Sequence, residues 1–260
     1  MNAPRLRLVR AAAAAAVVIA LTLPGCGPSS PPPSPGSEPV SFTSSGGIEL
    51  EGRLFEAEGA TAGVVLAHMR PADQSSWFEY ADRLADDGYR TLTFNFRGYC
   101  PGGEAGCSEG ETEPSELWRD VAAAVRYLRS TGVPRVAVIG ASMGGTAALV
   151  AAGQPTGRIG AVATLSAPTS IEGLVASPEL LSSMPAAKLF VAGNADATAA
   201  TDAQRMYDLS APPKRLEILP SEDHGTDLLE GNQGPNLQLV LSSWLARFLP
   251  LQEPTRDDEA

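Results

Sequence analysis

The sequence predicts an α/β fold with a mostly parallel central sheet, an antiparallel leading hairpin and helices on both faces. Between residues 40 and 250, short apolar runs typical of buried strands alternate with longer stretches whose apolar residues recur at helical spacing. At the start of this region, two strand-like segments flank the glycine-bearing turn Ser44-Ser45-Gly46-Gly47, which indicates a hairpin.

The expected elements follow from this alternation in chain order. The helix at residues 113–130 shows the pattern best, because Leu117, Val121 and Leu128 fall on one face. Strands are expected at residues 40–43, 48–55, 63–67, 89–96, 136–139, 159–165, 188–192 and 215–219, and the other helices at residues 75–87, 144–152, 201–209 and 236–249.

The first 25 residues have the features of an export signal. Three arginines precede an apolar run at residues 11–23, which is shorter than the roughly 20 residues that a membrane-spanning helix needs. The run ends in Leu23-Pro24-Gly25-Cys26, which resembles the bacterial lipobox, whose cysteine is lipidated and becomes the mature N-terminus. We therefore expect lipidation at Cys26; ordinary signal-peptide cleavage nearby is the alternative.

The remaining domain boundaries follow from composition. Residues 26–39 are rich in proline and serine, cannot bury apolar area and are expected to form an extended tether. Residues 40–250 form the folded domain, and residues 251–260 a polar tail. The expected location is outside the cytoplasm, with the domain attached to the cell membrane through the lipid anchor.

Charge and motif content exclude several classes of function. The chain has 30 acidic and 19 basic residues, a formal net charge of −11, and no dense basic stripe, so nucleic acid is not an expected partner. Its two histidines are far apart and lack the spacing of metal ligands, and no phosphate-binding glycine motif occurs. We expect neither a metal nor a cofactor.

Two cysteines, Cys100 and Cys107, remain once Cys26 is assigned to the anchor. Export to an oxidising compartment favours a disulfide between them, which would close a short glycine-rich loop. Two free thiols are the alternative.

The most informative motif is Gly140-Ala141-Ser142-Met143-Gly144, which joins a buried strand to a helix of small residues. A serine on such a sharp turn projects its hydroxyl from the edge of the sheet, and the flanking glycines remove side chains that would collide with neighbouring backbone. The dipole of the following helix favours negative charge near its N-terminus. Ser142 is therefore the predicted nucleophile.

A nucleophilic serine needs a base and an acid that orients the base. His224 is the only histidine after Ser142 in the sequence, and Asp196 lies just past the strand at residues 188–192. Asp196 would hold the imidazole in the required tautomer and stabilise its charged form. Asp202 is the main rival for this role, although it falls inside the following helix.

With these residues in place, residues 40–250 resemble the α/β-hydrolase superfamily, in particular its small lidless members similar to dienelactone hydrolases and serine aminopeptidases. The resemblance implies that the N–H groups of Met143 and Arg70 form the oxyanion hole. It also implies structural roles for His68 and for the Arg97-Gly98 pair. Typical members have a glycine after this histidine, where this sequence has Met69.

The expected activity is hydrolysis of a small carboxylic ester through an acyl-enzyme. The segment at residues 166–187 has room for one or two helical turns but not for a domain-sized cap, which favours an open site and short acyl chains. A peptidase or amidase of the same fold remains an alternative, as does a binding protein that keeps the fold without catalysis.

Overall fold

The computed structural model describes residues 36–155 and 158–252, and these form an eight-stranded sheet with the order β1-β2-β4-β3-β5-β6-β9-β10. The strands β1 and β2 pair antiparallel, β2 pairs antiparallel with β4, and the remaining neighbours are parallel. This confirms the predicted fold class. The strands are β1 (Ser37–Thr43), β2 (Glu49–Phe55), β3 (Ala62–Ala67), β4 (Arg90–Phe94), β5 (Arg135–Ala141), β6 (Ala161–Leu165), β9 (Ala187–Gly193) and β10 (Lys214–Leu219).

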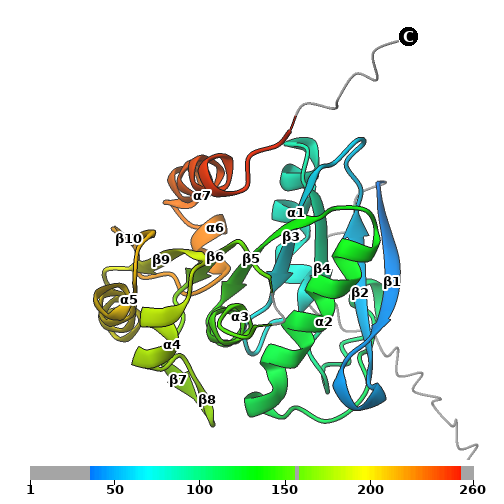
Figure 1. Cartoon of the computed structure of the whole chain (residues 1–260), viewed down its shortest axis with the longest axis horizontal. Helices are drawn as coiled ribbons and strands as arrows, with labels where there is room; N and C mark the ends of the chain where they lie inside the picture. The colour runs from blue at the N-terminus through cyan, green and yellow to red at the C-terminus, as the bar shows by residue number, and fades with distance from the viewer. Residues whose placement is uncertain (1–35, 156–157, 253–260) are drawn as a thin grey trace, which may run out of the picture.

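Helices cover both faces of the sheet, as Figure 1 shows. One apolar layer contains buried residues of α1 and α7, and the other contains buried residues of α2, α3 and α5. The helices are α1 (Phe78–Asp86), α2 (Leu117–Ser130), α3 (Met143–Ala152), α4 (Pro178–Ser183), α5 (Ala197–Leu209), α6 (Asp227–Glu230) and α7 (Gly234–Phe248). No helix in the described part of the chain is long and apolar enough to cross a membrane.

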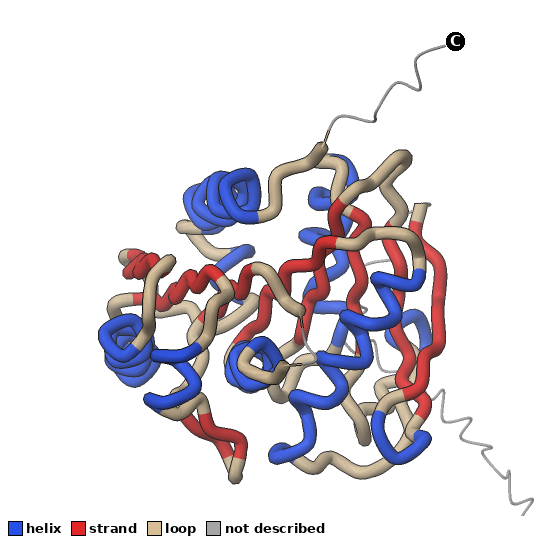
Figure 2. The backbone as a smooth tube through the Cα atoms, in the orientation of Figure 1, coloured by secondary structure: helices blue, strands red, loops and turns tan. Residues whose placement is uncertain are grey.

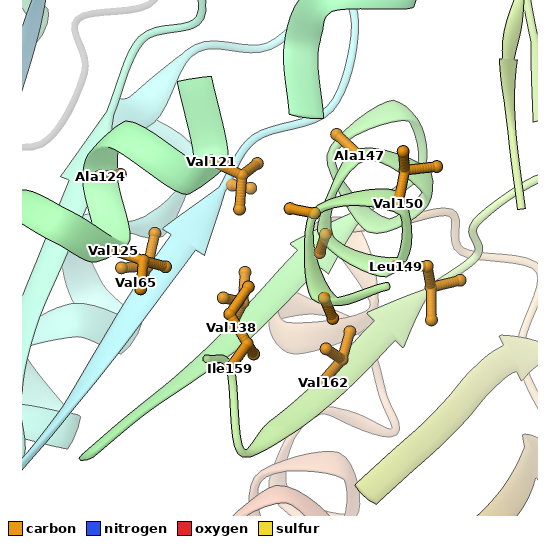
Figure 3. Close-up of a cluster of buried hydrophobic side chains, with 14 of the residues drawn as sticks. Val65, Val121, Ala124, Val125, Val138, Ala147, Leu149, Val150, Ile159 and Val162 are labelled. Atoms are coloured by element: carbon orange, nitrogen blue, oxygen red, sulfur yellow. The ribbon is translucent and has the colours of Figure 1, made fainter. Parts of the chain in front are cut away.

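The core on the α2–α3 side is built from small and branched side chains. Figure 3 shows Val65 and Val138 of the central strands against Val121 and Val125 of α2, with Ala147 of α3 beside them. All residues of α3 are buried, since alanines and glycines let this helix lie close to the sheet. The first turn of α3 is thereby held firmly at the carboxyl end of β5.

Several boundaries differ from the sequence-based expectation. The strand β1 begins at Ser37, inside the predicted tether, and Pro39 is accommodated there because β1 is an edge strand. The helix α5 begins at Ala197 rather than at residue 201, because the Asp196 side chain caps it by accepting from the Ala199 N–H. The predicted signal peptide, Cys26 and residues 253–260 of the tail lie outside the described residues.

The segment at residues 166–187 contains the expected short helix, α4, and no domain-sized cap. It also contains a small hairpin that the sequence analysis did not predict. Its strands are β7 (Ser170–Ile171) and β8 (Leu174–Val175), which pair antiparallel.

A buried ion pair fixes the loop that follows β4. Arg97 and Asp120 of α2 contact each other at 2.6 Å, and their side chains are only 6% and 0% exposed. Asp120 also accepts hydrogen bonds from the Ser44 hydroxyl and from the Arg97 backbone N–H. The pair therefore ties the leading hairpin, the loop after β4 and α2 together, in agreement with the structural role predicted for Arg97.

We expect Asp120→Ala to lower the free energy of unfolding by about 3–5 kcal/mol, because it leaves the Arg97 guanidinium buried without a counter-charge. Urea denaturation measures this change. Glu79→Ala is the control: it removes an exposed pair with Arg83 and should cost no more than about 0.5 kcal/mol. Equal effects of the two substitutions would contradict a structural role for the buried pair.

Candidate active site

Ser142 lies on a strained turn between β5 and α3. Its backbone has φ 47° and ψ −117°, a conformation that few residues other than glycine adopt. The turn is held from both sides: the Ser142 N–H donates to the Leu165 carbonyl of β6 at 2.8 Å, and the Ser142 carbonyl accepts from Gly145 N–H at 2.9 Å. The side chain is partly exposed at the carboxyl edge of the sheet.

The two glycines of the motif are required by close backbone contacts. A Cβ atom on Gly140 would collide with the backbone of Gly144, and one on Gly144 would collide with the carbonyls of Ala67 and His68. These contacts bring the end of β3 against the first turn of α3, and they agree with the prediction that the glycines avoid collisions with neighbouring backbone.

The structure brings His224 and Asp196 together. The imidazole Nδ1 of His224 lies 2.6 Å from Asp196 Oδ2, although the two residues are in different loops, after β10 and β9. Because the carboxylate accepts from Nδ1–H, the other ring nitrogen, Nε2, is left as an acceptor. The Asp196 side chain is 17% exposed and that of His224 is 43% exposed, so the pair is sheltered on the carboxylate side.

The rival carboxylates have other partners. Asp202 of α5 accepts hydrogen bonds from the backbone N–H and the hydroxyl of Thr169, at 3.2 and 3.1 Å. Asp223, adjacent to the histidine, accepts from the Ser221 hydroxyl at 2.6 Å. Asp196 is thus the carboxylate that contacts His224.

Backbone hydrogen bonds join the acid loop to the histidine loop. Asn194 N–H donates to the Leu219 carbonyl at 2.8 Å, and Ala195 N–H donates to the Ser221 carbonyl at 3.0 Å. A side chain on Gly193 would collide with the Ser221 carbonyl, so the two loops can approach this closely only with glycine there. Backbone hydrogen bonds between the two loops therefore fix the positions of Asp196 and His224 relative to each other.

Ser142 and His224 are not hydrogen-bonded to each other, although both lie in the described part of the chain. Their loops are nevertheless in contact: an ideal Cβ on Gly225 would lie 3.4 Å from the Cβ of Ala141. Catalytic hydrogen bonds are often long without substrate and tighten when substrate binds.

The predicted oxyanion donors lie at the same edge of the sheet. Met143 is the first residue of α3, so its N–H has no acceptor within the helix. Arg70 follows β3, the strand next to β5, and its guanidinium pairs with Glu172 at 2.7 Å. This mutual contact raises the pKa of Arg70 and lowers that of Glu172.

His68 has the structural role that the resemblance implied. It is fully buried, accepts from the Phe96 N–H at Nε2 and therefore donates from Nδ1 to the Met69 carbonyl, at 3.1 and 2.8 Å. Burial lowers its pKa to about 4, so the ring is neutral at physiological pH. His68 thus connects the turn before Arg70 to the loop after β4.

Met69 occupies the position where glycine is typical, and its side chain is used in packing. It is 8% exposed, and its sulfur lies directly against Gly225, the residue after His224. Gly225 has φ +59°, and a Cβ there would overlap the Met69 sulfur. The thioether therefore fills the space between the nucleophile turn and the histidine loop.

One feature beside the site, Tyr99, was not assigned by sequence reasoning, and the residue after it forms the predicted disulfide. Tyr99 lies with its hydroxyl 4.0 Å from the Met143 sulfur and its ring against His68, at 4.5 Å between ring centroids. The structure joins the next residue, Cys100, to Cys107 in a disulfide. A tyrosine after a glycine in a loop gives no periodic signal, so its position could be found only in three dimensions.

Within residues 36–155 and 158–252, no group of three or more histidine, cysteine or acidic side chains is arranged to hold a metal ion.

Comparison with known proteins identifies the fold family. The family model described as alpha/beta hydrolase fold matches residues 64–251, and no curated protein matches the chain.

Similar solved structures include the esterase Pf2001 of Pyrococcus furiosus, with 18% identity, a TM-score of 0.68, and coverage of 82% of this chain and 92% of that chain. A dienelactone hydrolase of Anabaena variabilis has 22% identity, a TM-score of 0.67 and coverage of 83% and 98%. The esterase domain of a Rhodothermus marinus protein has 23% identity, a TM-score of 0.64 and coverage of 82% and 99%. These likenesses establish a shared fold.

We expect Gly225→Ala to reduce the rate of any reaction at this site by about tenfold or more, because the added methyl must displace either Met69 or the histidine loop. Gly59→Ala is a matched control, since Gly59 has a similar φ of +66° but no atom within 4 Å of the added methyl. Activity of the purified variants is the measurement. Adding Met69→Ala to the Gly225→Ala variant should restore part of the lost activity, because it removes the side chain that the new methyl meets. If activity does not recover, backbone strain at residue 225 alone accounts for the loss.

Proposed function

This chain belongs to the α/β-hydrolase family, and we propose that it is a serine hydrolase that cleaves carboxylic esters with Ser142 as nucleophile, His224 as base and Asp196 as the acid. The observation that carries the proposal is the 2.6 Å contact between His224 Nδ1 and Asp196 Oδ2, beside a serine held at positive φ. The esterases among the similar folds support an ester as the substrate.

In the proposed reaction, the Ser142 oxygen attacks the acyl carbon and its proton passes to His224 Nε2. Asp196 keeps the proton on Nδ1 and stabilises the imidazolium that forms. The N–H groups of Met143 and Arg70 donate to the oxyanion, whose charge the N-terminus of α3 also favours. His224 then protonates the leaving alcohol, and an activated water molecule releases the acyl group from Ser142.

The proposed substrates carry short acyl chains, of about two to six carbons. A longer chain gains binding energy, about 0.8 kcal/mol per methylene, only where the protein buries it. The segment between β6 and β9 holds one short helix and a hairpin with two-residue strands, which are too small to enclose a long chain.

We expect Ser142→Ala and His224→Ala each to reduce kcat/KM for p-nitrophenyl butyrate by at least about 10³-fold, because the catalytic residues act as a unit. Asp196→Asn should have a comparable effect, since it would reverse the tautomer of His224. Asp202→Asn is the control and should retain activity within about threefold. A fluorophosphonate probe should label the wild type at Ser142. Severe loss in Asp202→Asn with a mild effect of Asp196→Asn would contradict the acid assignment.

We also propose that the protein is exported and attached to the cell membrane through Cys26. In a bacterial host, metabolic labelling with a fatty acid should tag the wild type, and Cys26→Ser should lose the tag and release the protein from membranes. The double variant Cys100→Ser/Cys107→Ser should keep the tag, because neither cysteine belongs to the lipobox-like motif that ends at Cys26. Labelling that persists in Cys26→Ser would contradict the anchor.

A further inference from the structure

A cavity lies at the end of the sheet that is opposite the candidate active site. Its volume is about 640 Å³, within the range of small-molecule sites, and its walls come from the end of α5, the start of β10 and the end of α7. Figure 2 shows this edge of the sheet between two helices, which Figure 1 labels α5 and α7. Lys214 begins β10 and His224 follows its carboxyl end, so the length of a six-residue strand, about 20 Å, separates the cavity from the proposed base.

Among the described residues, all the charged side chains that line this cavity are basic. They are Lys214, Arg215 and Arg247, in a chain whose formal net charge is −11. Only Arg215 has a carboxylate partner in the described part of the chain, Glu217 at 2.7 Å on the same strand. The Nζ of Lys214 donates to the Tyr207 carbonyl at 2.7 Å, and Arg247 has no hydrogen bond or ion pair within residues 36–155 and 158–252.

A further cation lies next to this cavity, inside the protein. Lys188 of β9 pairs in register with Lys214, and its side chain is fully buried. Its Nζ donates to two backbone carbonyls, those of Met184 and Ala186, at 2.8 Å each. Burial lowers the pKa of Lys188, and the charge of Lys214 lowers it further. Because neither lysine is paired with a carboxylate within the described ranges, an anion in the cavity would offset their mutual repulsion.

Aromatic side chains form much of the rest of the cavity. Tyr207, Trp244 and Phe248 line it, and two of the cations lie against these rings. The Nζ of Lys214 is 4.4 Å from the ring centroid of Tyr207, and the guanidinium carbon of Arg247 is 5.2 Å from that of Phe248. Trp244 is 2% exposed, and its Nε1–H has no acceptor among the described residues, although buried indole N–H groups usually have one. The cavity therefore offers positive charge beside flat apolar surface.

We propose that this cavity binds a small organic anion with an aromatic body. The anionic group pairs with Lys214 and Arg247, whose side chains have no carboxylate partner in the part of the chain that the structure describes. The aromatic body packs on the rings of Tyr207, Trp244 and Phe248. Aryl carboxylates and aryl phosphates share this chemistry. The site is separate from Ser142 and does not depend on the proposed ester hydrolysis.

Isothermal titration calorimetry of the full chain tests the proposal with 2-naphthoate and 2-naphthyl phosphate. Neutral 2-naphthamide lacks the charge and inorganic phosphate lacks the ring, so these two are the matched control ligands. We expect at least one of the naphthyl anions to bind with a Kd of about 1 mM or below. The amide and inorganic phosphate should each bind at least about fivefold more weakly, because each loses one of the two kinds of contact. Which of the two anions binds more tightly identifies the anionic group.

Substitutions locate the bound anion. Arg247→Gln and Lys214→Gln should each weaken binding about two- to fivefold, the range of an exposed ion pair, and glutamine at residue 214 can still donate a hydrogen bond. Arg126→Gln is the matched control, because Arg126 is also an exposed arginine without an ion pair in the described ranges and lies on α2, which packs against β3 and β4. This control should leave the Kd unchanged, as should Ser142→Ala.

Three outcomes would overturn the proposal. The first is no detectable binding of either naphthyl anion at about 10 mM. The second is an affinity for 2-naphthamide equal to that for the anions, which would show that charge is not recognised. The third is binding that Arg247→Gln and Lys214→Gln leave unchanged, or that Ser142→Ala removes, because the anion would then bind outside this cavity.

Discussion

The turn at Ser142 is the constraint on which the rest of the site depends. A non-glycine residue at φ 47° costs about 1–2 kcal/mol relative to ordinary backbone, and the cost is offset only because the surroundings fix both ends of the turn. The strand β5 is hydrogen-bonded on both sides, and α3 packs its whole length against the sheet. A serine held in this way needs no movement to present its hydroxyl at the sheet edge.

The same turn dictates what can surround it. Because Gly140 and Gly144 have no side chains, the end of β3 reaches van der Waals distance of α3, and the chain after His68 must pass beside the nucleophile. His68, which is buried and neutral, holds this part of the chain through hydrogen bonds with the Met69 carbonyl and the Phe96 N–H. On the other side, the proposed base and acid come from separate loops that backbone hydrogen bonds join. The site is thus assembled from the ends of four parallel strands, as is usual for open α/β sheets.

Sequence reasoning predicted the parts of this arrangement that follow from periodicity and spacing. The central strands and α2 have strong apolar patterns, and the Ser142 motif requires its strand–turn–helix context, so both were predictable. The β7–β8 hairpin was missed because two-residue strands are too short to show alternation, and Glu172, the first residue of its turn, is not typical of a type I′ turn. The start of α5 was missed because its first turn is Ala-Thr-Ala-Ala, which has no amphipathic pattern. The packing of Met69 on Gly225 joins residues 156 positions apart, and no local pattern encodes it.

Charge pairing explains why an acidic residue can lie at the same sheet edge as the proposed oxyanion hole. The chain has a formal net charge of −11, and an unpaired carboxylate near the proposed oxyanion would oppose its formation. Glu172 does not act in this way, because Arg70 holds its carboxylate at 2.7 Å and cancels most of its field at longer range. Arg70 would in turn favour the oxyanion more strongly if it were unpaired. The pairing thus neutralises the carboxylate of Glu172 and at the same time reduces the field that the Arg70 guanidinium exerts on its surroundings.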